Sequence, residues 1–161
     1  MAYRAVTVRE RSRGRSHIGT PFAGNRWWFE MPEKKTLERA REDAREGKAP
    51  STQAGEFVRE EMDHIREGKH GARNAKQAIA IGLSKARRAG VDLPAPKRGR
   101  TSEATRKKAE QDRAKGQSGT KTKPSAKRSR AVTGALQREG SAAASHLALS
   151  RHARQAARGK S

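Results

Sequence analysis

The chain contains no cysteine and few of the large apolar residues that build a core. The absence of cysteine excludes disulfides, zinc fingers and thiol chemistry. Leu, Ile, Val and Phe together number 18 of the 161 residues, which is below the roughly 20% under which a highly charged chain tends to stay disordered. A single large core is therefore excluded. A buried active site has to be enclosed by a core, and this chain has too few large apolar residues to enclose one. We therefore expect a protein that is not an enzyme and binds no metal and no cofactor.

Long hydrophobic runs are also missing. The longest apolar run is a few residues around Ile79, which is too short to cross a membrane. The first 24 residues are rich in Arg and loosely resemble an organellar transit peptide, but they lack the apolar region of a secretory signal. We therefore expect a cytoplasmic protein without a membrane span.

What the chain does have is a large excess of positive charge, with 38 Lys and Arg against 17 Asp and Glu. Residues 30–68 carry eight basic and eleven acidic groups, whereas residues 69–161 carry 24 basic and five acidic groups. Solubility alone requires a net charge of only about 2–8 on a small domain. A cationic field of the size seen here attracts a polyanion, and nucleic acid is the leading partner.

Two segments in the middle of the chain have the pattern of paired amphipathic helices. The first runs from a cap at residue 51 or 52 to Gly68, and it carries an apolar stripe that consists of Ala54, Phe57, Val58, Met62 and Ile65. The second runs from the capping pair Asn74 and Gln77 to Gly90. Because these two segments have matching apolar faces, the sequence predicts a helical hairpin core over residues 51–93.

The other segments are predicted to be arms around this core. Residues 1–30 are a basic N-terminal extension, and residues 31–50 form a charged, exposed helix, in which Leu37 is the only large apolar residue after Pro32. Residues 94–124 are a basic linker with a conditional helix, and residues 125–161 are a basic C-terminal helical tail. The expected fold class is mostly α, a small helical hairpin with long basic arms that are disordered or conditionally helical.

The basic linker contains the sharpest nucleic-acid motif. Lys97, Arg98, Gly99 and Arg100 follow a proline-rich stretch and resemble an AT-hook, in which both arginines insert into a narrow minor groove. Thr101 stands where an AT-hook usually has proline. The alternative is a basic linker that contacts phosphates without reading the sequence.

Basic side chains on the second hairpin helix are further candidates for DNA contact. The residues concerned are Lys76, Lys85, Arg87 and Arg88. If the two helices formed a helix-turn-helix, Asn74, Lys76 and Gln77 would reach base edges. The six-residue connection between the two helices, from Gly68 to Arg73, is longer than the tight turn of a helix-turn-helix. Phosphate contact from a solvated face is therefore the favoured interpretation.

The C-terminal half adds two clusters of candidate phosphate contacts. The first cluster is in the conditional helix and the second is in a Lys-, Ala- and Ser-rich tail that resembles a linker-histone tail; together they contain Arg106, Lys107, Lys108, Lys127, Arg128 and Arg130.

The histidines do not predict a site. His64 and His70 flank a helix end near Glu60 and Glu67, which makes a metal site conceivable. There is no tight His pair at i and i+4, and isolated surface histidines are far commoner. No nucleophile–base pair or P-loop is present either.

Three motifs together resemble a family of short, basic bacterial proteins that is classed as a domain of unknown function. They are residues 51–58, residues 68–71 and the Lys-Gln-Ala-Ile-Ala-Ile-Gly-Leu-Ser core that begins at Lys76. The resemblance covers residue 31 to the C-terminus, so residues 1–30 fall outside it. It implies a bacterial, non-enzymatic protein of a kind often labelled DNA-binding.

The expected function is therefore sequence-neutral, nucleoid-associated DNA binding by phosphate neutralisation. One alternative is an RNA- or ribosome-associated basic factor. Another is an adaptor in which the acidic amphipathic helix at residues 51–67 binds a protein partner.

Overall fold

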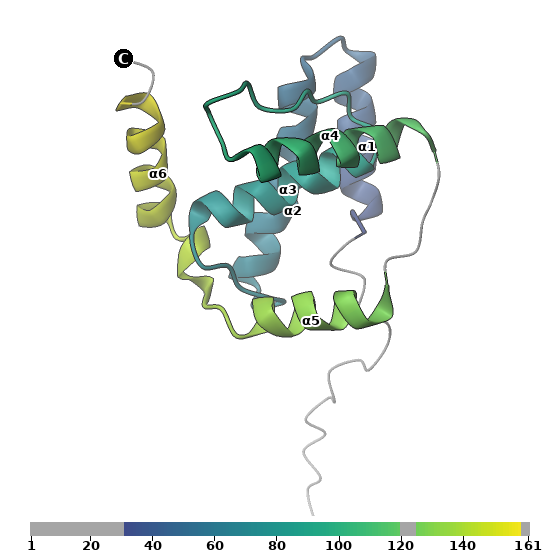
Figure 1. Cartoon of the computed structure of the whole chain (residues 1–161). Coiled ribbons are helices and arrows are strands. Elements are labelled where there is room, and N and C mark those ends of the chain that lie inside the picture. The colour runs from purple at the N-terminus through teal and green to yellow at the C-terminus, as the bar shows by residue number, and fades with distance from the viewer. Residues whose placement is uncertain (1–30, 120–124, 159–161) are drawn as a thin grey trace, which may run out of the picture.

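The computed structural model describes residues 31–119 and 125–158, and every regular element in these ranges is helical. The predicted mostly α class is confirmed. Residues 1–30, 120–124 and 159–161 lie outside the described residues, and with them the predicted basic extension. In chain order the helices (Figure 1) are α1 (Lys34–Arg45), α2 (Pro50–Arg66), α3 (Ala75–Arg88), α4 (Glu103–Gln117), α5 (Ala126–Gln137), the 3₁₀ turn η2 (Ser141–Ala144) and α6 (His146–Arg158).

The ends of α3 follow the local sequence as predicted. The Asn74 side chain accepts a hydrogen bond of 2.9 Å from the backbone N–H of Gln77, and the Gln77 side chain accepts one of 2.9 Å from the N–H of Arg73. Gly90 ends the helix with a φ of +99°, which an L residue rarely adopts. These two caps satisfy backbone groups that a helix end otherwise leaves without a partner.

The start of α2 differs from the prediction. Ala49 is the N-cap, and Pro50 occupies the first turn, where its fixed φ suits a helix start and no N–H is required. No side chain caps this end, so residues 51 and 52 do not have the predicted role. Gly68, with a φ of +71°, follows the helix as expected.

The predicted apolar stripe of α2 forms the centre of the molecule. Ala54, Phe57 and Ile65 are fully buried and Met62 nearly so. One core cluster joins Phe57 to Ala86 and Val91, and a second joins Met62 and Ile65 to Ala78. In Figure 1 α3 crosses α2 steeply. Helix α2 therefore contributes to two small clusters, which fits the low content of large apolar residues.

Gly82 marks the closest approach of α2 and α3. A Cβ atom added at Gly82 would lie 2.7 Å from the Cα of Val58, which is main chain and cannot rotate away. The missing side chain is what permits the two backbones to approach.

Gly82→Ala is expected to lower the free energy of unfolding by about 1–3 kcal/mol, because the overpacking outweighs the gain in helix propensity. The matched control is Gly55→Ala on the exposed side of α2, where nothing lies within 4 Å of the added atom. That control should raise stability by about 0.5–1 kcal/mol. Urea denaturation followed by circular dichroism measures both. A stabilised Gly82→Ala protein would show that the helices do not meet there.

Helix α1 packs against α2, so the prediction that residues 31–50 form an exposed helix is wrong. Thr36, Ala40 and Asp43 are buried, and Leu37 packs against the Phe57 cluster. The contact surface consists largely of small and polar side chains, which leave no apolar stripe for sequence analysis to detect. Their small size lets the two helices pack closely.

Helix α4 is docked on α3, which corrects the prediction of a conditional helix that forms on a partner or intermittently. Ala109 and Asp112 are buried, and the Ser84 hydroxyl donates to Asp112 at 2.5 Å. Near the end of α4, Gly116 lies directly against the backbone of Arg87 and Gly90. The two helices therefore run in the same direction, with the connection through residues 89–102 returning the chain to their common start (Figure 1).

The C-terminal segment joins the core through its backbone and its alanines. The N–H of Gly71 donates to the carbonyl of Leu136 at 2.9 Å, and the N–H of Ala72 donates to that of Gly140 at 3.2 Å. Ala143 and Ala144 of η2 are buried in the Met62 cluster. Among the described helices, none combines the length and the apolar character needed to span a membrane.

Candidate nucleic-acid interface

Eight of the predicted phosphate-contacting side chains are exposed and form no ion pair with an acid in the described part of the chain. They are distributed over α3, the 97–100 segment, α4 and α5, and they are Lys76, Arg88, Lys97, Arg98, Lys107, Lys127, Arg128 and Arg130. Such side chains are able to exchange water and counterions for a phosphate without first breaking an ion pair.

The AT-hook-like segment is a turn. The N–H of Arg100 donates to the carbonyl of Lys97 at 3.2 Å, and Gly99 has a φ of +81°. A glycine with positive φ at the third position of such a turn is the signature of type II geometry. All four residues from Lys97 to Arg100 are exposed, but the backbone of this part of the predicted basic linker is folded into a turn.

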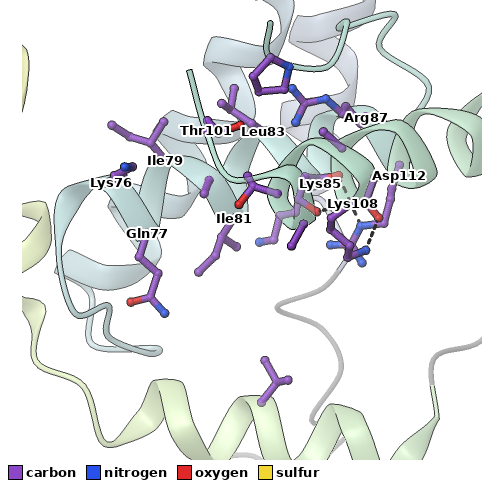
Figure 2. Close-up of a pocket in the computed structure, with 18 of the residues that line it drawn as sticks. Lys76, Gln77, Ile79, Ile81, Leu83, Lys85, Arg87, Thr101, Lys108 and Asp112 are labelled. Carbon is purple, nitrogen blue, oxygen red and sulfur yellow. Dashed lines mark hydrogen bonds and ion pairs between the residues drawn. The ribbon is translucent and has the colours of Figure 1, made fainter. Parts of the chain in front are cut away.

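Two of the candidate residues on α4 are held by acids of the same helix. Arg106 forms ion pairs with Glu103, at 2.6 Å, and with Glu110. Lys108 lies 2.5 Å from Asp112 (Figure 2). The acids that hold Arg106 are exposed, and a surface ion pair contributes about 0–1 kcal/mol, so a phosphate competes with them at modest cost. Asp112 is buried, so its ion pair with Lys108 is costlier to break.

Lys85 and Arg87 are buried, so the prediction that they contact phosphates is wrong. The Lys85 ammonium lies 2.8 Å from Glu61 and 3.4 Å from Glu60, and its side chain is completely inaccessible. The Arg87 guanidinium donates to the backbone carbonyls of Leu93 and Pro94. Burial lowers the pKa of Arg87, partly offset by the charge of Asp112.

Three acids in or next to α1 and α2 neutralise basic groups in their own part of the molecule. Glu56 pairs with Arg39 and Arg59, and Lys48 lies 2.7 Å from each of two acids, Asp43 and Glu46. These acids therefore do not offset the exposed cations of α3 to α5.

The helix-turn-helix alternative does not fit the observed packing. Asn74 and Gln77, which would have to reach base edges, use their side chains to cap α3. Helix α4 also covers part of α3 (Figure 1), so α3 is not presented as a free recognition helix.

An open groove of about 700 Å³ lies between α3, α4 and α5 (Figure 2). Its apolar lining includes Ile79 and Ile81 of α3 and Val132 of α5, and basic residues such as Lys76 and Lys108 also line it. The apolar face of α2, in contrast, is occupied by the core. That face is therefore not available to the protein partner that the adaptor alternative places at residues 51–67.

A buried ionic cluster surrounds Lys85. Glu61 Oε1 lies 3.1 Å from His70 Nε2, and Glu61, His64 and His70 are all buried. The His64 Nε2–H donates to Glu33 at 2.8 Å. Sequence analysis named the two histidines but missed Glu61, although the Glu61-x-x-His64 spacing places both side chains on one face of a helix.

The protonation of this cluster follows from its contacts. Burial acts most strongly on Glu61 and raises its pKa, but the interactions with His70 and Lys85 outweigh it and hold the pKa below the ordinary value. Burial likewise lowers the pKa of His70, and the contacts with Glu61 and the Gly71 carbonyl raise it to above the ordinary value. The hydrogen bond from His64 lowers the pKa of Glu33. The carboxylates are therefore ionised, and His70 favours the charged form.

Comparison with known proteins gives one family. A family of unknown function (DUF6496) matches residues 51–98, which is less than a third of the chain and runs from α2 to the start of the 97–100 turn. This agrees with the resemblance to a family of unknown function, but over a shorter range. No curated protein and no solved structure matches the chain.

Proposed function

We propose that this protein is a non-enzymatic, largely sequence-neutral DNA-binding protein that acts by phosphate neutralisation and associates with the nucleoid. The observation that carries the proposal is the separation of charge. Asp43, Glu46 and Glu56 are paired with cations of α1, α2 or the turn between them, and Glu60 and Glu61 are paired with the buried Lys85. Residues 69–161, in contrast, carry 24 basic groups against five acids. The unpaired exposed cations of α3 to α5 are suited to a polyanion.

Sequence-neutral binding follows from the kind of side chain exposed. Lys and Arg on helix surfaces contact phosphates, which carry no direct sequence information, while base reading requires a rigid element placed in a groove. The two side chains best placed for base reading, Asn74 and Gln77, cap α3 instead. Binding by α5, whose Lys127 and Arg128 are exposed, would therefore depend on charge more than on sequence.

The test compares two triple variants with the same loss of charge. The first neutralises α5 through Lys127→Gln, Arg128→Gln and Arg130→Gln. The matched control neutralises acid-paired cations through Arg39→Gln, Lys48→Gln and Arg59→Gln. If α5 contacts three phosphates, the first variant should reduce the slope of log affinity against log salt by about 2.7 for duplex DNA. The control should keep the slope of the parent.

Fluorescence anisotropy with a labelled duplex measures both slopes. Equal losses in the two variants would mean that net charge alone matters and that α5 is not part of an interface. Tighter binding to structured RNA than to duplex DNA at the same salt would favour the RNA alternative over this proposal.

A further inference from the structure

Two buried histidines and a buried glutamate converge on one point beside α2. One ligand atom from each of Glu61, His64 and His70 lies within 4.8 Å of the other two, and all three side chains are buried. We propose that these residues form a binding site for a divalent transition-metal ion, with zinc as the best match and a water as the fourth ligand. Two histidines and one glutamate are an established donor set for zinc.

The distances are close to those of a loaded site. With metal–ligand distances of about 2.0–2.1 Å, two ligand atoms on one tetrahedral zinc lie about 3.3 Å apart. Glu61 Oε1 and His70 Nε2 are 3.1 Å apart, so this pair already has that spacing. Closing the remaining separations, which are at most 4.8 Å, needs side-chain shifts of about 1.5 Å.

The ring nitrogens outside the site are oriented as metal-binding histidines usually are. A ligating histidine typically donates its second N–H to a carboxylate or a backbone carbonyl, which fixes the tautomer and the ring orientation. The His64 Nε2–H donates to Glu33 at 2.8 Å, and the His70 Nδ1–H donates to the Gly71 carbonyl at 3.1 Å. The ion would take the second nitrogen of each ring, His64 Nδ1 and His70 Nε2, and His70 Nε2 is the atom that contacts Glu61 Oε1.

The surrounding charges match a divalent cation. Glu33, Glu60 and Glu61 contribute three negative charges around the cluster, and Lys85 contributes one positive charge. Zinc binding releases the proton of His70, since a ligating imidazole is neutral, and the zinc ion then brings the sum to zero. The Lys85 ammonium contacts Glu61 Oε2, whereas the ion would take Oε1, the oxygen that faces His70. Lys69, which contacts Glu33, is offset by Glu67, which the sum also leaves out.

A metal here would have a structural effect. Glu61 and His64 belong to α2, while His70 lies in the connection between α2 and α3, so one ion would link the helix to the connection. None of the three ligands is exposed, so none of them belongs to the proposed DNA interface. The metal site can therefore be tested independently of DNA binding.

The test uses the full chain, freed of metal with EDTA and labelled with ¹⁵N, and zinc as the probe. Zinc should raise the midpoint of thermal unfolding by about 10 °C at a concentration 100-fold above Kd. Long-range ¹H–¹⁵N spectra should show coordination at His64 Nδ1 and His70 Nε2. Co²⁺ in place of zinc should give the intense visible absorption of a tetrahedral site.

His70→Gln removes one ligand and should abolish the zinc-dependent stabilisation. The matched control, His146→Ala with His152→Ala on α6, removes two histidines outside the cluster and should leave it unchanged. The proposal is overturned if zinc does not shift the ring signals of His64 and His70, or if the α6 variant loses the effect. The spectra of the parent decide the question even if His70→Gln does not fold.

Discussion

The affinity of this protein for duplex DNA is expected to fall by roughly 10³–10⁵ between about 50 and 200 mM salt, as for other proteins that neutralise six to ten phosphates. The eight exposed cations without an acidic partner fall within that range of contacts. Each phosphate neutralised by one of them releases counterions, and salt opposes this release. A fall of this size corresponds to about 4–7 kcal/mol of binding free energy.

Anisotropy titrations at several salt concentrations, with one A·T-rich and one G·C-rich duplex, measure this effect. The two duplexes should give nearly the same slope and affinity, because phosphates are common to both. A preference for the A·T-rich duplex could arise only at the turn formed by residues 97–100. Arg98 and Arg100 are exposed there, and the narrow minor groove of A·T-rich DNA favours arginine. A shallow slope with a strong preference for one duplex would contradict phosphate-driven binding.

Removal of the Lys85 ammonium is the second change with a large expected effect. Lys85→Met should lower the free energy of unfolding by about 3–5 kcal/mol, because it leaves buried carboxylates without their cation. Glu61 lies 2.8 Å from the ammonium, and both side chains are inaccessible. An uncompensated charge in such surroundings is far more costly than a lost surface pair.

The matched control is Lys76→Met, which removes an exposed lysine from the same helix and should change stability by less than about 0.5 kcal/mol. Adding Glu61→Gln to Lys85→Met should restore part of the loss, since the buried negative charge is then removed as well. Urea denaturation in the presence of EDTA measures all three and excludes any contribution from metal. Equal stabilities for Lys85→Met and Lys76→Met would show that the buried ion pair does not stabilise the fold.

Sequence analysis succeeded where the cause of a structure is local. The caps at Asn74 and Gly90 satisfy the ends of α3 as their residue types predict. The stripe of α2 is buried because its spacing places one apolar face along a helix. The charge asymmetry needs no fold at all, because it is a property of composition.

The docking of α1 and α4 was missed for a physical reason. Their contacts use Ala40 and Ala109, together with close backbone approach at Gly116. Small residues gain stability by letting backbones and neighbouring side chains pack closely, and they add little to any hydrophobic pattern. A search for stripes of large apolar residues therefore predicts that such helices are exposed.

What the sequence by itself determined is a helical, strongly cationic chain with one central pair of amphipathic helices. The tertiary structure alone decided which cations remain available to a partner. Lys76 and Lys85 are both lysines of α3, yet Lys76 is exposed and the side chain of Lys85 is inaccessible. The difference arises from Glu60 and Glu61, which lie some 25 residues earlier and meet Lys85 only when α2 crosses α3. Burial of a charge depends on the partner that compensates it, and that partner is brought into contact by packing.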